Sequence, residues 1–252
     1  MVAPIGLGTV KLGRNAGVKY PRAFSLPSDA EVLDLLEGAL ARGVTLFDTA
    51  PAYGTSERRL APFVRRHRER VVLATKAGER FCDGTSVHDF SPEGIERSLV
   101  ASLDALGTDR VDLLLLHSDG RDLAILDAPG VVDRLFALRS RGLVRAVGIS
   151  AKTAEGIDRA AELGLDCAMA TYSRADPSRG AALARAHALG VGVLAIKALD
   201  SGHVATADDP ARRASAARDA IAFAAGAPFV DAVVLGTLSL AHLDEAIAAL
   251  VS

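Results

Sequence analysis

The chain has little of several features that would mark it for a particular class of protein. Its 252 residues include two cysteines, Cys82 and Cys167, too few for a disulfide framework or a cysteine-based zinc site. The six histidines are scattered and form no HxH or HExxH pair, so we expect no bound metal. The formal charge is -2, and this lack of excess basic residues argues against nucleic acid or an anionic membrane as a partner.

Long hydrophobic runs are also absent from the sequence. No run of about 18 uninterrupted apolar residues occurs, and the first residues show no basic stretch followed by an apolar one. We therefore expect a cytoplasmic protein without a membrane span. Apolar residues make up 50% of the chain, which is enough for a large core, and a length of 252 residues is close to the usual size of a single α/β barrel. We predict one domain over residues 1–252.

Short β-rich apolar runs alternate with longer amphipathic segments along the whole chain. The eight predicted strands are 5–9, 44–48, 71–75, 111–117, 144–150, 167–171, 191–197 and 231–236. The predicted helices are 28–42, 56–68, 92–106, 129–141, 153–163, 178–189, 208–225 and 239–250. Eight consecutive strand–helix units favour a closed (β/α)8 TIM barrel over an open doubly wound sheet, which usually has about six strands. The longest irregular stretches, 10–27 and 77–91, follow strands and would open on the face where barrel enzymes keep their chemistry.

Ionisable side chains end three neighbouring predicted strands. Asp48 ends the second strand and Tyr53 lies in the loop after it, Lys76 follows the third strand, and His117 ends the fourth. Each has an ordinary structural interpretation when taken singly: a turn cap, a crevice filler or a hydrogen-bonded core histidine. Together they place a carboxylate, a phenol, an ammonium and an imidazole within reach of one point, which predicts a proton-transfer site.

The chemistry of such a set follows from the ordinary acidities of its members. A phenol titrates near pH ~10 and needs help to exchange protons at neutral pH. Lys76 would stabilise the phenolate of Tyr53, Asp48 would keep Lys76 charged, and His117 would orient a substrate oxygen. The set suits carbonyl reduction, but no side chain can supply the hydride.

Several motifs in order along the chain closely resemble the aldo-keto reductases. They are GLGT (6–9), FDTAPAYGTSE (47–57), ATKAG (74–78), LLLLH (113–117), GIS (148–150), IKALDSG (196–202) and LGTLSLAHLDEAI (235–247). The resemblance implies a (β/α)8 barrel that reduces a small-molecule aldehyde or ketone with NADPH, with NADH possible as an alternative cofactor. It also implies that Tyr53 is the general acid, that Lys76 and Asp48 tune it, and that His117 orients the carbonyl.

The same resemblance implies which residues hold the cofactor. Ser150 would contact the nicotinamide carboxamide, Thr9 would lie beside its ribose, and the segments after the seventh and eighth strands would hold the phosphates. The implied cofactor-binding residues are Thr9, Ser150, Lys197, Leu199, Ser201, Gly202, Gly236, Thr237, Ser239 and His242. This chain departs from the family at Ala151 and Met169, where carboxamide-binding Asn and Gln are usual, and at His242 and Ala246 near the adenosine end.

Two other functions stay open at this point. Lys76 or Lys197 could form a Schiff base with a carbonyl substrate, as in a lyase. A barrel with altered carboxamide contacts could also bind nucleotide without catalysis, as a sensor or interaction protein. Specificity would rest on the segments 10–27 and 77–91. The candidate side chains there for a polar or anionic substrate are Lys11, Arg14, Lys19, Tyr20, Arg22, Phe24, Phe81 and His88.

Overall fold

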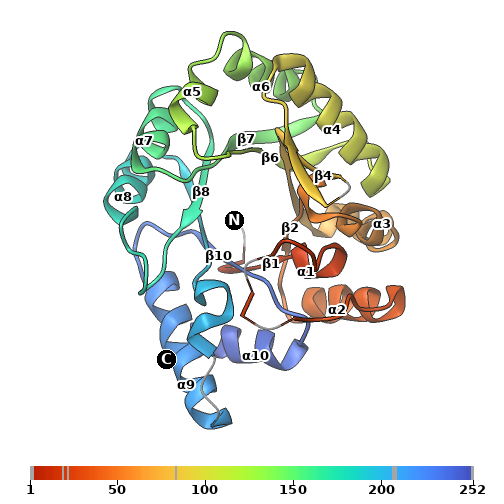
Figure 1. Ribbon diagram of the computed structural model, residues 1–252, viewed down its shortest axis with the longest axis vertical. Coiled ribbons are helices and arrows are strands. Elements are labelled where there is room, and N and C mark those ends of the chain that lie inside the picture. The colour runs from red at the N-terminus through yellow and green to blue at the C-terminus, as the bar shows by residue number, and fades with distance from the viewer. Residues whose placement is uncertain (1–2, 19, 22, 83, 206–208, 251–252) are drawn as a thin grey trace.

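Eight parallel strands close into a barrel in the computed structural model, which describes residues 3–18, 20–21, 23–82, 84–205 and 209–250 (Figure 1). The barrel strands are β1 (Ile5–Gly8), β2 (Leu46–Asp48), β3 (Val72–Ala77), β6 (Val111–His117), β7 (Val144–Ser150), β8 (Cys167–Thr171), β9 (Gly192–Ile196) and β10 (Ala232–Leu235). Around the barrel they follow the order β1-β10-β9-β8-β7-β6-β3-β2. The predicted (β/α)8 fold is confirmed, and all eight predicted strands are present with ends that differ by a few residues.

Helices surround the barrel, as the outer ring in Figure 1 shows. They are α2 (Asp29–Ala41), α3 (Ser56–His67), α4 (Pro92–Leu106), α6 (Val131–Ser140), α7 (Ala154–Glu162), α8 (Gly180–Ala188), α9 (Pro210–Ala225) and α10 (Leu240–Ala248). The shorter helices are α1 (Val10–Gly13), η1 (Pro51–Tyr53), η2 (Arg68–Arg70), α5 (Asp122–Leu126) and η3 (Asp200–Ala205). Ser28 and Glu31 form a capping box at the start of α2. Within the described ranges, no helix has the length and apolar character that crossing a membrane requires.

One predicted irregular stretch is wrong in part. Residues 77–91 contain an antiparallel hairpin of β4 (Glu79–Cys82) and β5 (Thr85–His88), which pairs Glu79 with His88 and forms a sheet separate from the barrel. Every residue of β5 is exposed, so the hairpin lacks the apolar alternation by which a half-buried strand is recognised. The stretch 10–27 likewise begins with the short helix α1.

Side chains along each barrel strand alternate between two cores. Leu113 and Leu115 of β6 point into the barrel, where they join a small apolar cluster with Leu46 of β2 and Ala74 of β3. The intervening leucines of β6 belong to the larger core between the strands and the helices. Because successive side chains of a strand face opposite sides, the residues two positions beyond this inner cluster also face the interior.

Candidate active site

The strand alternation brings three of the predicted catalytic residues to the inner face at the carboxyl end of the barrel. Asp48 lies two residues beyond Leu46, Lys76 two beyond Ala74, and His117 two beyond Leu115. The register pairs Asp48 with Ala74 and Lys76 with Leu115. Lys76 therefore lies two residues beyond the partner of Asp48 along β3, and His117 lies two residues beyond the partner of Lys76 along β6. This stagger is the shear of a closed barrel, and it carries the three side chains around the mouth in a rising series.

Lys76 is the most completely enclosed of these groups, with 1% of its side chain exposed. Its Nζ donates to Asp48 Oδ1 at 2.5 Å and to the carbonyl oxygen of Thr49 at 3.0 Å. Burial alone would lower the pKa of Lys76, but the negative partners outweigh it and leave the pKa raised. Lys76 is therefore an ammonium ion at neutral pH.

Tyr53 is presented to this ammonium by the turn that follows β2. Its ring centroid lies 4.7 Å from Lys76 Nζ. Burial raises the pKa of the phenol, Lys76 opposes that rise, and Asp48 adds to it. The turn packs closely on α1: a Cβ added at Gly13 would lie 2.1 Å from Ser56 N and 2.4 Å from Tyr53 O. A glycine at position 13 is therefore needed for the placement of Tyr53.

His117 lies beside Tyr53, with the two ring centroids 6.1 Å apart and nearly perpendicular. Its Nδ1 is 2.9 Å from Glu79 Oε2, on the first strand of the hairpin. Glu79 also accepts a hydrogen bond from Ser86 Oγ at 2.6 Å. Sequence reasoning missed Glu79; the one available signal was a carboxylate three residues after the lysine of the ATKAG motif.

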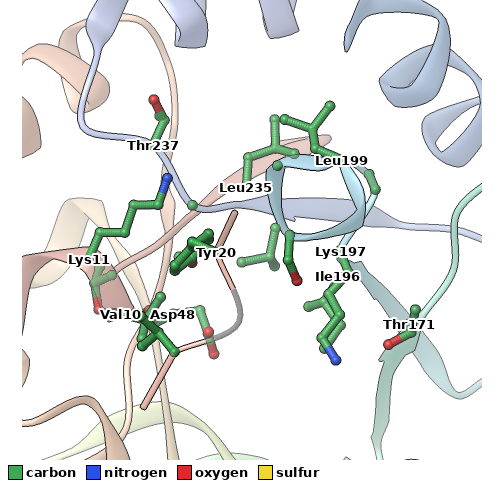
Figure 2. Close-up of a pocket in the computed structure, with 18 of the residues that line it drawn as sticks. Val10, Lys11, Tyr20, Asp48, Thr171, Ile196, Lys197, Leu199, Leu235 and Thr237 are labelled. Atoms are coloured by element: carbon green, nitrogen blue, oxygen red, sulfur yellow. Dashed lines mark hydrogen bonds between the residues drawn. The ribbon is translucent and has the colours of Figure 1, made fainter. Parts of the chain in front are cut away.

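A cavity of about 900 Å³ opens at this end of the barrel and extends from the predicted catalytic group of Asp48, Tyr53, Lys76 and His117 to the loops after β9 and β10. Figure 2 shows Lys11, Tyr20 and Asp48 on one side of the cavity and Thr171, Ile196 and Lys197 on the other. Thirteen of the predicted site residues line the cavity: Thr9, Asp48, Tyr53, Lys76, His117, Ser150, Lys197, Leu199, Ser201, Gly202, Gly236, Thr237 and His242. The remaining one, Ser239, caps α10 by accepting a hydrogen bond from the backbone of His242.

The lining suits an elongated anionic ligand that ends at the catalytic group. Lys11, Arg213 and Arg218 line the cavity together with Thr237, just before α10, and His242 in its first turn. The N-terminus of such a helix favours a phosphate. Gly202, which also lines the cavity, adopts φ 94°, a left-handed conformation that favours glycine. Across the described ranges, no group of three or more His, Cys, Asp or Glu side chains could hold a metal ion.

The segment after β1 lies over this cavity. Arg14 donates to Ala52 O at 2.9 Å, and its guanidinium carbon is 3.6 Å from the ring centroid of Phe81 on the hairpin. Tyr20 extends toward the loop after β10, because a Cβ at Gly236 would lie 3.4 Å from the Tyr20 hydroxyl. Burial, with a contribution from Tyr53, raises the pKa of Tyr20 to about 12.

Other candidates in these two segments have different surroundings. Lys11 Nζ lies 4.3 Å from the ring centroid of Tyr20, and Phe24 meets Tyr20 edge to face. His88 stacks on Phe90. Two further candidates from the sequence, Lys19 and Arg22, lie outside the described residues.

Comparison with known proteins links this geometry to one family. Residues 4–219 match the sequence profile of the Aldo/keto reductase family. A D-threo-aldose 1-dehydrogenase of a Pseudomonas species is 34% identical over 194 residues, which are 66% of this chain and 58% of that protein. An NADH-specific methylglyoxal reductase of Escherichia coli is 30% identical over 187 residues, 68% of this chain and 56% of that protein. The chain thus spans less than two thirds of the length of these relatives.

Solved structures resemble the barrel over nearly its whole length. A structure from Pseudomonas aeruginosa, described as an aldo-keto reductase, superimposes with a TM-score of 0.85 and 41% identity, covering 98% of this chain and 89% of that one. The holo form of an aldo-keto reductase from Bacillus halodurans gives a TM-score of 0.84 at 20% identity, covering 100% of this chain and 87% of that one. The second likeness concerns the fold alone.

Proposed function

Because the chain belongs to the aldo/keto reductase family, we propose that it reduces an aldehyde or ketone to an alcohol with a nicotinamide dinucleotide, and that Tyr53 is the general acid. The observation that carries the proposal is the Lys76 ammonium, which pairs with Asp48 at 2.5 Å and lies 4.7 Å from the ring centroid of Tyr53 at the cavity wall. The oxidoreductase names of its relatives support the reaction class.

Each residue of the catalytic group has a separate part in this mechanism. Tyr53 Oη donates its proton to the substrate oxygen, where negative charge develops as the carbonyl is reduced. Lys76 stabilises the tyrosinate that remains, because its ammonium lies 4.7 Å from the ring centroid and its charge lowers the pKa of the phenol. Asp48 holds Lys76 in its charged form. A bound nicotinamide cofactor supplies the hydride.

The cofactor would occupy the length of the cavity. Thr9 and Ser150 lie near the catalytic end, Lys197 to Gly202 follow β9, and Gly236 to His242 follow β10. The arginines that α9 contributes to the lining, Arg213 and Arg218, add positive charge for phosphates. We propose NADPH as the cofactor, with NADH as the alternative that the E. coli relative's name suggests.

A lyase that uses Lys76 as a Schiff-base nucleophile fits the geometry less well. Schiff-base formation needs a neutral amine, and such lysines have a lowered pKa. The pKa of Lys76 is raised instead, since its ion pair with Asp48 favours the ammonium. Borohydride trapping with a carbonyl substrate should therefore leave Lys76 unmodified.

The test is to follow NADPH and NADH oxidation with a panel of carbonyl compounds, in the wild type and in Tyr53→Phe. We expect the substitution to lower kcat by roughly 100-fold to 10,000-fold, the usual contribution of a general acid. The matched control is Tyr172→Phe, because Tyr172 packs between Phe223 and Phe229 and is not part of the cavity lining. Equal rates in wild type and Tyr53→Phe would refute the role of Tyr53, and tight cofactor binding without turnover would favour the nucleotide-sensor alternative.

A further inference from the structure

The contact between Glu79 and His117 is a feature of this site that the catalytic group alone does not explain. Glu79 Oε2 lies 2.9 Å from His117 Nδ1, with 14% and 18% of the two side chains exposed. Ser86 Oγ holds the other carboxylate oxygen at 2.6 Å from across the hairpin. The carboxylate is therefore oriented by its own strand pair and aimed at one particular nitrogen of the imidazole.

The carboxylate of Glu79 is ionised throughout the neutral range. Burial would raise its pKa, but His117 and Ser86 outweigh burial and lower the pKa of Glu79 to about 2. Nδ1 of His117 makes no hydrogen bond of regular geometry, so its 2.9 Å contact with Oε2 is electrostatic rather than a linear hydrogen bond. An unprotonated Nδ1 would point its lone pair at the negative carboxylate oxygen, which is repulsive. A proton on Nδ1 would be attracted to that oxygen.

We propose that Glu79 is a positioning residue that keeps a proton on Nδ1 of His117 and so leaves Nε2 as the nitrogen that meets the substrate oxygen. The contact of Nε2 with a substrate oxygen rests on the proposed reductase function. The position of the proton on the imidazole of His117 does not. A neutral His117 then accepts a hydrogen bond from an alcohol through Nε2. A protonated His117 donates one to a carbonyl through the same atom.

Charged groups on neighbouring elements also affect the protonation of His117. Lys76 on β3 disfavours the imidazolium, while Asp48 on β2 and Glu79 on β4 favour it. Tyr53 on η1 faces the ring edge to face, and Ser150 on β7 is its partner in register. Burial is the largest influence, and it lowers the pKa of His117.

Protonation of His117 should therefore affect carbonyl reduction and alcohol oxidation in opposite ways. Carbonyl reduction should weaken as His117 loses its proton, and alcohol oxidation should strengthen over the same pH range. Glu79 sets where that range lies, because its negative charge stabilises the imidazolium. Removing the charge should move both transitions to lower pH by ~1–3 units, the usual effect of one charge at short range.

Nitrogen-15 NMR of the imidazole rings tests the assignment without any turnover. The His117 signal is identified by its loss in His117→Gln, and wild type should show neutral His117 with its proton on Nδ1. Glu79→Ala should shift the proton toward Nε2, and Ser86→Ala, which only loosens the carboxylate, should do so to a smaller degree. A wild-type ring protonated on Nε2, or an unchanged ring in Glu79→Ala, would overturn the proposal.

The pH profiles of kcat/KM in both directions provide the second readout. In Glu79→Gln we expect the pH-dependent transitions in kcat/KM for reduction and for oxidation to move together to lower pH. If Glu79 had a purely structural role, its substitution would instead lower both rates at every pH. The control is Glu155→Gln, which removes an exposed carboxylate at the start of α7 and should leave both transitions in place. Unmoved transitions in Glu79→Gln would contradict the proposal. A wild type that turns over no carbonyl but keeps the Nδ1 proton would refute the reductase function and still support the role of Glu79.

Discussion

The buried pair of Lys76 and Asp48 makes a sharp prediction for stability. Their side chains are 1% and 4% exposed, and Nζ and Oδ1 are 2.5 Å apart. Lys76→Met leaves a carboxylate in the barrel with no cation, and Asp48→Leu leaves an ammonium whose remaining acceptor is the neutral carbonyl oxygen of Thr49. Breaking a buried pair in this way costs ~3–5 kcal/mol, because the charge that remains is desolvated without compensation.

The double variant should behave differently from the sum of the singles. With both charges removed, the two apolar side chains fill the inner core beside Leu46 and Ala74. Replacing a buried ion pair by apolar residues of similar volume is often neutral or stabilising, so we expect the double variant to unfold within ~1 kcal/mol of wild type. The coupling energy from the double-mutant cycle should then exceed ~3 kcal/mol.

Urea unfolding followed by circular dichroism at pH 7 measures all four proteins. Lys152→Met is a matched control, since Lys152 is exposed and its loss should change the free energy of unfolding by less than ~0.5 kcal/mol. The pKa of Lys76 is raised in the folded protein, so its stabilising contribution is complete below the unfolded value of ~10.4 and declines as pH rises through the folded one. Additive single effects, or singles as stable as the control, would refute this account of the pair.

Two further substitutions test the scaffold around the site. Gly13→Ala should lower both kcat and the melting temperature, because the new methyl group would lie 2.1 Å from Ser56 N and displace the turn that carries Tyr53; a normal kcat would show that the turn is not held by this contact. Ser28→Ala should cost ~1 kcal/mol in urea unfolding with kcat unchanged, because it removes the capping box of α2; an effect on kcat instead would place α2 in the site.

The sequence was sufficient to predict the barrel and the meeting of Asp48, Lys76 and His117 at its mouth, because both follow from a single rule. Leu113 and Leu115 of β6 face the inside of the barrel because alternate residues of a strand share one face. A polar residue two positions further along the strand must therefore also face the inside. Asp48, Lys76 and His117 were therefore recognisable as a set.

Glu79 and the β4–β5 hairpin were not predictable in the same way. The contact of Glu79 with His117 depends on a hairpin outside the barrel, and every residue of its second strand is exposed and gives no periodic apolar signal. The approach of Tyr20 to Gly236 depends on the path of a loop, which local residue types do not determine.

The β4–β5 hairpin forms its own two-stranded sheet and shares no strand pairing with the barrel. It nevertheless carries the carboxylate that faces His117, while the Lys76–Asp48 pair belongs wholly to barrel strands. For protein engineering this makes residues 79–88 an exchangeable module. Grafting a different hairpin at this point would alter the environment of the imidazole and leave the ion pair that serves Tyr53 untouched.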